Sequence, residues 1–287
     1  MKAPARWLPP VLALALPLAL YLLTCSRSVG PVDAGELIVA AATGGVAHPP
    51  GFPLFLLLGR LFTLLPVGTP AFLVAALSAV TSAGAALGIY LTACCLLEGP
   101  HRRLLALAAA LLTATAFSVW EWATVAEVYG LNLCLFTLVL WGVARWHQAV
   151  PGGSASRNAL ILVACLGGLG AANHTTTFAI LGGTTLVTLL VPLSRGSILR
   201  GEARRGRTVL LLLAALLLPL SLYLYLPLAA RSGSAMNWGD PRDASALLRH
   251  VTGWQYQEYL TGGSAARFFD TLGTVFLPLW LRQWGVW

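Results

Sequence analysis

The sequence predicts an all-α polytopic membrane protein, a bundle of about eight transmembrane helices. Two observations lead to this fold class. Of the 287 residues, 57% are hydrophobic and only 10% are charged, whereas a soluble domain carries roughly 25% charged residues. The apolar residues also occur in long runs, which are typical of transmembrane helices and differ from the alternating strands of a membrane β-barrel.

Hydropathy places the helices in order along the chain. The first apolar run follows Lys2 and Arg6 as a signal peptide would, but no small-residue cleavage pattern comes after it, so we expect it to stay as a helix. A span needs roughly 20 apolar residues. The predicted spans are 8–24, 70–97, 104–119, 124–146, 158–172, 175–193, 208–228 and 271–287. The apolar piece 53–66 is shorter and contains Arg60, so we expect it to lie at the membrane surface.

The charged residues predict which span ends share a side of the membrane. If 53–66 does not cross, the basic loops 101–103, 145–157 and 195–207 lie on the side of the N-terminus, and most acids lie on the other side. If it crosses, those basic loops lie on the opposite side of the membrane from the N-terminus. The positive-inside rule favours the first topology. The net charge of +8 is therefore a topology signal, and we expect no nucleic-acid partner.

This topology predicts one transmembrane domain over residues 1–287 with two outer loops, 25–69 and 229–270. We expect juxtamembrane helices in the first of them. The last span ends at Trp287 with no polar cap, so the chain is expected to be a piece of a longer protein. The five cysteines show no metal-ligand spacing and their odd number gives no disulfide framework, so we predict no metal site.

The first outer loop contains the densest group of polar residues. Asp33 and Glu36 are three positions apart, which places both on one face of a helix. His48 precedes a double proline that cannot continue a helix, and a second helix can begin at Pro53. Asp-x-x-Glu is also a helix-capping pattern. Two interpretations thus stay open for the pair of acids, a structural cap or a general base that accepts the proton of a hydroxyl.

Other candidates are expected to face the same outer cavity. For each of them a structural role is also open: His48 and Asn173 with His174 as turn residues, and Arg60 as a side chain that snorkels to the headgroups. Glu127 lies deeper than a solvated acid should, which favours a polar role inside the bundle. The candidate substrate-binding residues are His48, Arg60, Glu127, Tyr129, Asn173, His174, Arg231, Trp238, Asp240 and Tyr256.

In the second outer loop, residues 237–241 (NWGDP) also suit a tight turn closed by an Asx bond. Tyr256 offers a surface on which a sugar or peptide can stack. Arg231 is the cation of this loop best placed for a phosphate.

Four segments in this order resemble one known family. They are DAGELIVAAATGGVAHPPGFPLFLLLGRLF (33–62), WATVAEVYGLN (122–132), GGLGAANHTTT (167–177) and the stretch 223–256 with NWGDP and VTGWQY. They resemble the transmembrane-protein-260-like family (glycosyltransferase family 117), a group of protein O-mannosyltransferases of the GT-C superfamily. The resemblance runs through most of the chain and implies a GT-C-like bundle with a juxtamembrane first outer loop.

The resemblance also implies roles for particular residues. GT-C enzymes keep an essential acid in the first outer loop, which favours Asp33 as the base, and related enzymes carry His-Pro-Pro there, which favours His48. The family is expected to carry an arginine about two residues before Arg231, where Ala229 stands. This departure leaves the assignment of Arg231 as a donor ligand open.

The predicted function is an inverting glycosyltransferase that moves a hexose, mannose by the resemblance, from a polyprenyl-phosphate donor to Ser/Thr hydroxyls of exported proteins. The sequence has no Walker loop or dinucleotide fingerprint, which favours a lipid-borne donor, and no cofactor is expected beyond that donor. The expected partners are the lipid-linked sugar, an acceptor polypeptide and membrane lipid. Only one of the 18 basic residues is a lysine, which suggests a GC-rich genome. We expect the protein in a bacterial inner membrane, with the site on the extracytoplasmic face.

Two alternatives remain. A transporter or flippase of a lipid-linked or anionic solute would carry charges at the bilayer midplane and inverted repeats. Here the acids cluster towards one face and no repeat is detectable. A non-catalytic assembly subunit or an inactive fragment is the other alternative, favoured by the abrupt end of the chain.

Overall fold

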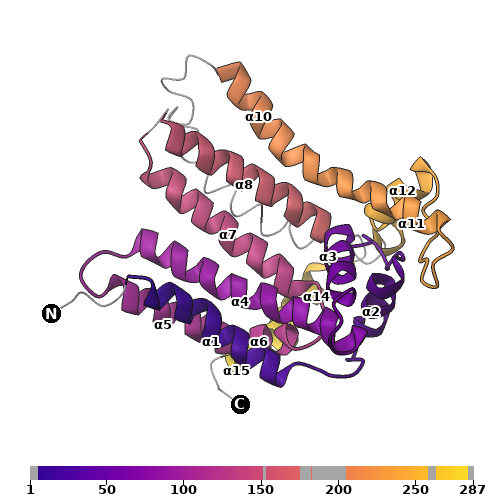
Figure 1. Cartoon of the computed structure of the whole chain (residues 1–287), viewed down its shortest axis with the longest axis horizontal. Coiled ribbons are helices and arrows are strands. Elements are labelled where there is room, and N and C mark those ends of the chain that lie inside the picture. Colours follow the sequence, from indigo (N-terminus) through magenta and orange to yellow (C-terminus); the bar gives the residue numbers. More distant parts are fainter. Residues whose placement is uncertain (1–5, 151–152, 175–181, 183–204, 258–262, 284–287) are drawn as a thin grey trace.

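The computed structural model of the chain describes residues 6–150, 153–174, 182, 205–257 and 263–283. Its long helices pack side by side in a bundle, and a group of short helices gathers at one end (Figure 1). The long helices are α1 (Leu8–Thr24), α4 (Pro70–Leu96), α5 (Arg102–Thr115), α7 (Tyr129–Gln148), α8 (Ser154–Asn173) and α10 (Arg205–Leu217). The short helices at that end include α2 (Ala34–Thr43), α3 (Pro53–Thr63), α11 (Tyr225–Arg231) and α12 (Ala244–Val251).

The bundle is that of an integral membrane protein, as predicted. Four described helices are long and apolar enough to cross a membrane: Pro70–Leu96, Tyr129–Gln148, Ser154–Asn173 and Gly206–Arg231. The last of these contains α10, the 3₁₀ segment η1 (Leu218–Leu224) and α11. α1 matches the predicted span 8–24, whereas the predicted span 175–193 lies, apart from residue 182, outside the described residues. The predicted span 271–287 overlaps α14 (Ala265–Thr271), the π-helical turn η3 (Leu272–Phe276) and α15 (Leu277–Arg282).

The predicted span 104–119 is wrong in one respect, because its helix is broken. α5 ends at Thr115, Ala116 is extended, and α6 (Phe117–Ala123) leaves at an angle of 66°. The pair counts as a fifth span only if the two pieces cross together. Hydropathy reports only how apolar a segment is, so it does not detect one extended residue between two apolar helices.

Close packing of α4 against α7 positions the loop between α6 and α7. A Cβ atom on Gly84 would lie 2.8 Å from the sulfur of Cys134, and one on Gly130 would lie 2.8 Å from the carbonyl oxygen of Ser78. These glycines therefore let the two helices approach closely, as small residues do in membrane proteins. The predicted span 124–146 begins later than expected, at Tyr129, because residues 124–128 form this loop.

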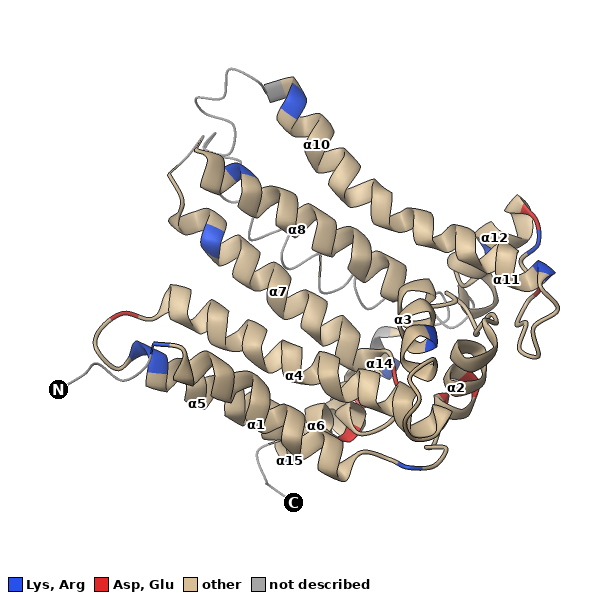
Figure 2. Ribbon diagram, in the orientation of Figure 1, with Lys and Arg blue, Asp and Glu red and all other residues tan. Residues whose placement is uncertain are grey.

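The charges of the described residues are unevenly distributed along the bundle. Arginines lie at the end where α5 and α8 begin and α7 ends, while Glu36 of α2 lies at the opposite end, where α3, α11 and α12 also contain arginines (Figure 2). α2 and α3 both lie at this acidic end, between the end of α1 and the start of α4. This polarity agrees with the topology favoured by the positive-inside rule.

Candidate active site

The turn between α2 and α3 holds the polar cluster. α2 ends at Thr43 and is followed by Gly44, whose φ of 68° is the left-handed conformation that glycine adopts without strain. α3 begins at Pro53 after Phe52, whose φ of 43° is unusual for a large side chain. Tight packing around buried Phe52 maintains this conformation. His48 lies between the two helices, in the turn that they frame.

Asp33, Glu36 and His48 converge in this turn. The backbone N–H of His48 donates a hydrogen bond to the Glu36 carboxylate, and its ring Nδ1 lies 3.2 and 3.3 Å from the two oxygens of that carboxylate. The other ring nitrogen, Nε2, lies 3.9 Å from an oxygen of Asp33. The Asp33 side chain is 41% exposed and that of Glu36 is 14% exposed. Glu36 is thus committed to His48, whereas Asp33 faces solvent.

The two carboxylates favour the charged form of the His48 ring. Burial alone would lower the pKa of His48, but the hydrogen bond to Glu36 and the charges of Glu36 and Asp33 raise it above its ordinary value. Burial also pushes the pKa of Glu36 upward, yet its hydrogen bonds with His48 outweigh this and leave it lowered. The cluster therefore holds the His48 ring between two carboxylates that favour its protonated form.

These three residues also offer ligand atoms within 4.8 Å of one another, a spacing that suits a metal ion. A metal ion would need a deprotonated His48 ring. The raised pKa of His48 works against that state, because the proton on the ring already neutralises part of the acidic charge. The prediction that the site uses no metal stays a prediction.

The capping interpretation of Asp33 and Glu36 is wrong. Asp33 occupies the N-cap position of α2, but its side chain accepts no capping hydrogen bond. Glu36 bonds to His48, twelve residues further along the chain. Neither half of a capping box is therefore present.

Glu127 is a buried acid beside this cluster. The hydroxyl of Ser78 on α4 fixes its backbone, accepting from the N–H of Glu127 at 3.1 Å and donating to its carbonyl at 2.9 Å. Burial, followed by the negative charge of Asp33, raises the pKa of Glu127 from its ordinary 4.5 to about 7. Backbone hydrogen bonds and the His48 charge offset this only in part. Glu127 thus exchanges its proton near neutral pH.

A line of aromatic rings connects His48 to the helices of the bundle. The centroid distances are 4.9 Å from His48 to Phe52, 5.5 Å from Phe52 to His174, 6.1 Å from His174 to Tyr129 and 5.2 Å from Tyr129 to Trp122. Burial lowers the pKa of His174, and the charge of His48 lowers it further. His174 is therefore the neutral histidine of the pair, and the rings join α3, α8, α7 and α6 at the site.

The second outer loop closes over the same turn. The N–H of Val46 donates to the carbonyl of Met236 at 2.9 Å, and the N–H of Trp238 donates to the carbonyl of Val46 at 3.1 Å. These bonds form an isolated parallel bridge beside His48. The ring of Trp238 lies 6.1 Å from the His48 ring. Of the candidates in this loop, Trp238 thus contacts the cluster directly.

Other predicted site residues have different partners. Arg60 donates to the carbonyl of Ala42, at the C-terminal end of α2, where a cation is favourable. Arg231 donates to the carbonyl of Arg242 at 2.6 Å. Asp240 accepts from the side chains of Asn237 at 2.7 Å and of Arg242 at 2.8 Å, so side-chain bonds stand where an Asx bond to a backbone N–H was expected. None of these contacts reaches Asp33, Glu36 or His48.

Asn173 and Tyr256 also lie apart from the cluster. Asn173 is fully buried at the end of α8 and donates to the carbonyl of Val128 at 3.2 Å, so it ties α8 to the start of α7. Its side-chain oxygen has no partner among the described residues. Tyr256 is partly exposed in the short segment η2 (Trp254–Tyr256). Both assignments to substrate binding stay predictions.

Comparisons with known proteins agree with this geometry. A sequence model of the Protein O-mannosyl-transferase TMEM260 N-terminal domain matches residues 33–194, a stretch that begins at Asp33. The chain belongs to the TMEM260 family. This confirms the resemblance, and the matched stretch includes the first three of the four segments.

Two curated members of the TMEM260 family are similar to this chain. The Protein O-mannosyl-transferase TMEM260 of Mus musculus is 33% identical over 246 residues, which are 83% of this chain and 33% of the mouse protein. The Dictyostelium discoideum protein of the same name is 33% identical over 138 residues, 46% of this chain and 16% of that protein. The chain thus spans about a third of the length of the mouse relative.

A solved structure supports the fold. The S. cerevisiae protein O-mannosyltransferase Pmt1-Pmt2 complex bound to the sugar donor aligns with a TM-score of 0.61 at 15% identity, covering 79% of this chain and 33% of that chain. At this identity the likeness concerns the fold alone. It confirms the predicted GT-C-like helical bundle.

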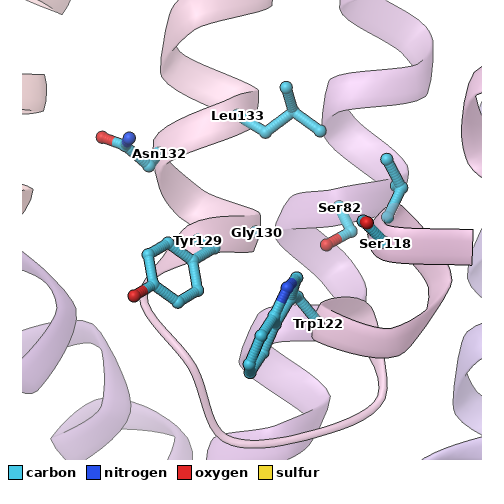
Figure 3. A pocket seen from close by; sticks show the side chains of 8 residues that line it. Ser82, Ser118, Trp122, Tyr129, Gly130, Asn132 and Leu133 are labelled. Carbon is cyan, nitrogen blue, oxygen red and sulfur yellow. The ribbon is translucent and has the colours of Figure 1, made fainter. Parts of the chain in front are cut away.

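A cavity of about 460 Å³ adjoins the site in this TMEM260-family chain. It lies between α4, α6 and α7, and Figure 3 shows Tyr129 and Trp122 side by side at its wall. Tyr129 therefore belongs both to the cavity and to the line of rings that leads to His48. The full lining is Ser82, Ser118, Val119, Trp122, Tyr129, Gly130, Asn132 and Leu133.

Sequence reasoning missed two residues at this site. Phe52 is the ring between His48 and His174, and its position after the Pro-Pro-Gly turn gave no sign of it. His250 bonds to the carbonyl of Ala47 from 203 positions away. Its only signal was a histidine on a short amphipathic segment of the second outer loop.

Proposed function

We propose that this chain carries the active site of a protein O-mannosyltransferase. It would transfer mannose from a polyprenyl-phosphate donor to a Ser or Thr hydroxyl of an exported polypeptide. The observation that supports this most is the geometry of the cluster: the exposed carboxylate of Asp33 lies beside the His48 ring, which the less exposed carboxylate of Glu36 holds in place. The names of the relatives and the donor-bound fold neighbour support the same reaction.

Asp33 is the general base in this proposal, and Glu36 is the positioning acid. A base must come within hydrogen-bond reach of the hydroxyl that it deprotonates. Asp33 is the more exposed of the two carboxylates, and it makes no capping bond that would occupy its oxygens. Glu36 accepts from both the backbone and the ring of His48, so it is less available to a substrate.

The reaction balances as one in-line displacement. Asp33 takes the proton of the acceptor hydroxyl while the oxygen of that hydroxyl forms a bond to the anomeric carbon of mannose. The bond from that carbon to the phosphate oxygen breaks, and polyprenyl phosphate leaves with the electron pair. A single displacement inverts the anomeric carbon, and the proton on Asp33 passes to solvent.

His48 supplies positive charge where the phosphate leaves. An ionised ring that is already oriented stabilises developing negative charge without reorganisation at the moment of reaction. The bonds of Arg60 to Ala42 and of Arg231 to Arg242 direct these guanidinium groups to other partners. We therefore assign phosphate contact to His48 before either arginine.

The cavity beside Tyr129 is our candidate for the donor lipid. Its wall is mainly apolar and comes chiefly from α6 and α7, with Ser82 from α4, and its size falls within the range of about 300–1,000 Å³ seen for ligand pockets. A polyprenyl segment is apolar, so it would enter from the bilayer and leave its phosphate at the polar end beside Tyr129. Energy from binding the lipid would then position the sugar at Asp33.

The acidic end of the bundle is proposed to face the outside of a bacterial inner membrane. The motivation is the gathering of basic residues at the opposite end. In a variant whose five native cysteines are replaced, a single cysteine at Ser234 should react with an impermeant thiol reagent in intact cells, and one at Ser154 should not. Labelling at Ser154 alone would reverse the orientation.

Transfer by the purified chain in lipid tests the proposed function. The assay follows radiolabel from polyprenyl-phosphate-mannose to a Ser/Thr peptide, with GDP-mannose as the matched soluble donor and Asp33→Asn as the inactive control. We expect transfer from the lipid donor alone, and no loss of transfer after treatment with a chelator. Transfer from GDP-mannose without polyprenyl phosphate would overturn the lipid donor, and loss of activity on chelation would overturn the metal-free site.

A further inference from the structure

His250 is a buried histidine that the proposed chemistry does not use. It lies on α12 in the second outer loop and is only 5% exposed. Its Nε2 lies 3.0 Å from the carbonyl oxygen of Ala47. A carbonyl oxygen only accepts hydrogen bonds, so Nε2 must carry a proton and donate it.

The carbonyl of Ala47 belongs to the same planar peptide group as the N–H of His48. That N–H donates to the carboxylate of Glu36. His250 and Glu36 therefore hold opposite edges of one peptide plane, the plane from which the His48 side chain projects. Hydrogen bonds in such a chain polarise and strengthen one another.

The ring of His250 has little room to move. A Cβ atom on Gly51 would lie 3.1 Å from its Nε2, and one on Gly239 would lie 2.9 Å from its Nδ1. Both glycines have positive φ values, 91° and 67°, so each turn brings bare backbone against the ring. The ring is therefore enclosed between the first and the second outer loop.

We propose that His250 is a positioning residue for His48: by holding the Ala47–His48 peptide it keeps the His48 ring between Glu36 and Asp33. The contribution to turnover rests on the proposed function, whereas the effect on His48 itself does not. His250 touches neither reacting group in this proposal and acts through the peptide alone. The second outer loop would in this way set the geometry of a site whose reactive side chains all come from the first.

Three substitutions separate this role from simple packing. His250→Gln places an amide N–H close to the position of Nε2, so it can still donate to Ala47. His250→Asn is shorter, and its amide lies where Nδ1 was, too far from Ala47 to donate. His250→Leu fills the space without any donor. Gln and Asn differ by one methylene group, so they form the matched pair even if His250→Leu fails to fold.

The first measurement is NMR of the protein labelled with ¹⁵N at its five histidines, with signals assigned by single substitutions. We expect His250 as the Nε2–H tautomer and a raised pKa for His48 in the wild type and in His250→Gln. In His250→Asn and His250→Leu the pKa of His48 should fall towards its ordinary value. An unchanged His48 pKa in His250→Asn would overturn the proposal, whether or not the protein transfers mannose.

The second measurement is steady-state transfer with polyprenyl-phosphate-mannose. We expect kcat to fall about 10-fold or more in His250→Asn and His250→Leu, because small misplacement of a catalytic group is costly. His250→Gln should stay within about 3-fold, with the KM for the donor little changed in all three. Wild-type turnover in His250→Asn would overturn the positioning role. A wild type that transfers no mannose would instead overturn the proposed function and leave the NMR result to decide on His250.

Discussion

The two outer loops contribute differently to the candidate site. The first supplies the reactive side chains, Asp33, Glu36 and His48, within 16 consecutive positions. The second supplies backbone groups, the ring of Trp238 and the buried ring of His250, which fix the turn around His48. Chemistry is thus concentrated in one short segment, while its geometry depends on residues about 200 positions away.

This comparison predicts that the largest loss of activity comes from the first loop. Asp33→Asn keeps the shape of the side chain but removes its ability to take a proton. Turnover should fall by about 10²-fold or more, the contribution expected of a general base. Stability should change little, because Asp33 makes no capping bond. The assay is transfer from polyprenyl-phosphate-mannose, with thermal unfolding in parallel.

The matched control is Asp33→Ala, which a capping role would penalise by about 1 kcal/mol. We expect no such loss of stability. Near-normal turnover of Asp33→Asn on the same donor and acceptor would refute Asp33 as the base and move that role to Glu36 or Glu127.

A smaller loss should follow from Glu36→Gln. The amide still accepts from the N–H of His48, but it no longer offers negative charge to the ring. The pKa of His48 should therefore fall, because Glu36 is a main cause of its increase. We expect turnover to fall about 10-fold, less than for Asp33→Asn, since a misplaced or neutral His48 weakens phosphate stabilisation while the base remains.

The pH profile of kcat checks this expectation. In the wild type the limb that reports His48 should lie above the ordinary histidine value, and in Glu36→Gln it should move to lower pH. If the pH profile of Glu36→Gln matched that of the wild type, Glu36 would not control the pKa of His48 during turnover. A loss larger than that of Asp33→Asn would reverse the two roles.

The sequence predicted the first loop better than the second for a physical reason. In an apolar chain a buried acid or histidine is costly, so Asp33, Glu36 and His48 stood out by their chemistry alone. Helical spacing then placed Asp33 and Glu36 on one face. Residue type and short-range spacing can both be read from a single sequence without knowledge of tertiary contacts.

The rest of the site depends on contacts that no local pattern encodes. His250 and Ala47 meet across 203 positions, and Arg60 finds its partner in the preceding helix. The break at Ala116 is one extended residue inside an apolar run. The capping pattern of Asp33 and Glu36 misled because a tertiary partner, His48, competed with the local one and won.

Glu127, which belongs to neither outer loop, should make the stability of the folded protein depend on pH. In the folded protein its pKa is about 7, against an ordinary value of 4.5. The folded state thus binds more protons than the unfolded state between these two pH values, so stability should fall as pH rises from about 4.5 to about 7. Glu127→Gln stays neutral, and this part of the decline should disappear.

The measurement is the thermal midpoint of the wild type and of Glu127→Gln across this pH range in the same detergent. The stabilising contribution of His48 is fully present below its ordinary pKa of 6.5 and is lost as pH rises through its raised pKa, so below pH 6.5 it adds no slope to either curve. Parallel curves for the two proteins would show that Glu127 does not hold its proton in the folded state.

The smallest effect is expected from the acid of the second loop. Asp240, like Asp33, has a cationic neighbour, with Arg242 at 2.8 Å. Its side chain is 53% exposed, so solvent screens this ion pair and it contributes little to stability. Asp240→Asn keeps a side-chain oxygen that can accept from Asn237 and Arg242, so turnover should stay within about 2-fold of the wild type. If transfer instead fell as far as in Asp33→Asn, with folding intact, the second loop would contain chemistry of its own, and the contrast between a reactive loop and a supporting loop would be wrong.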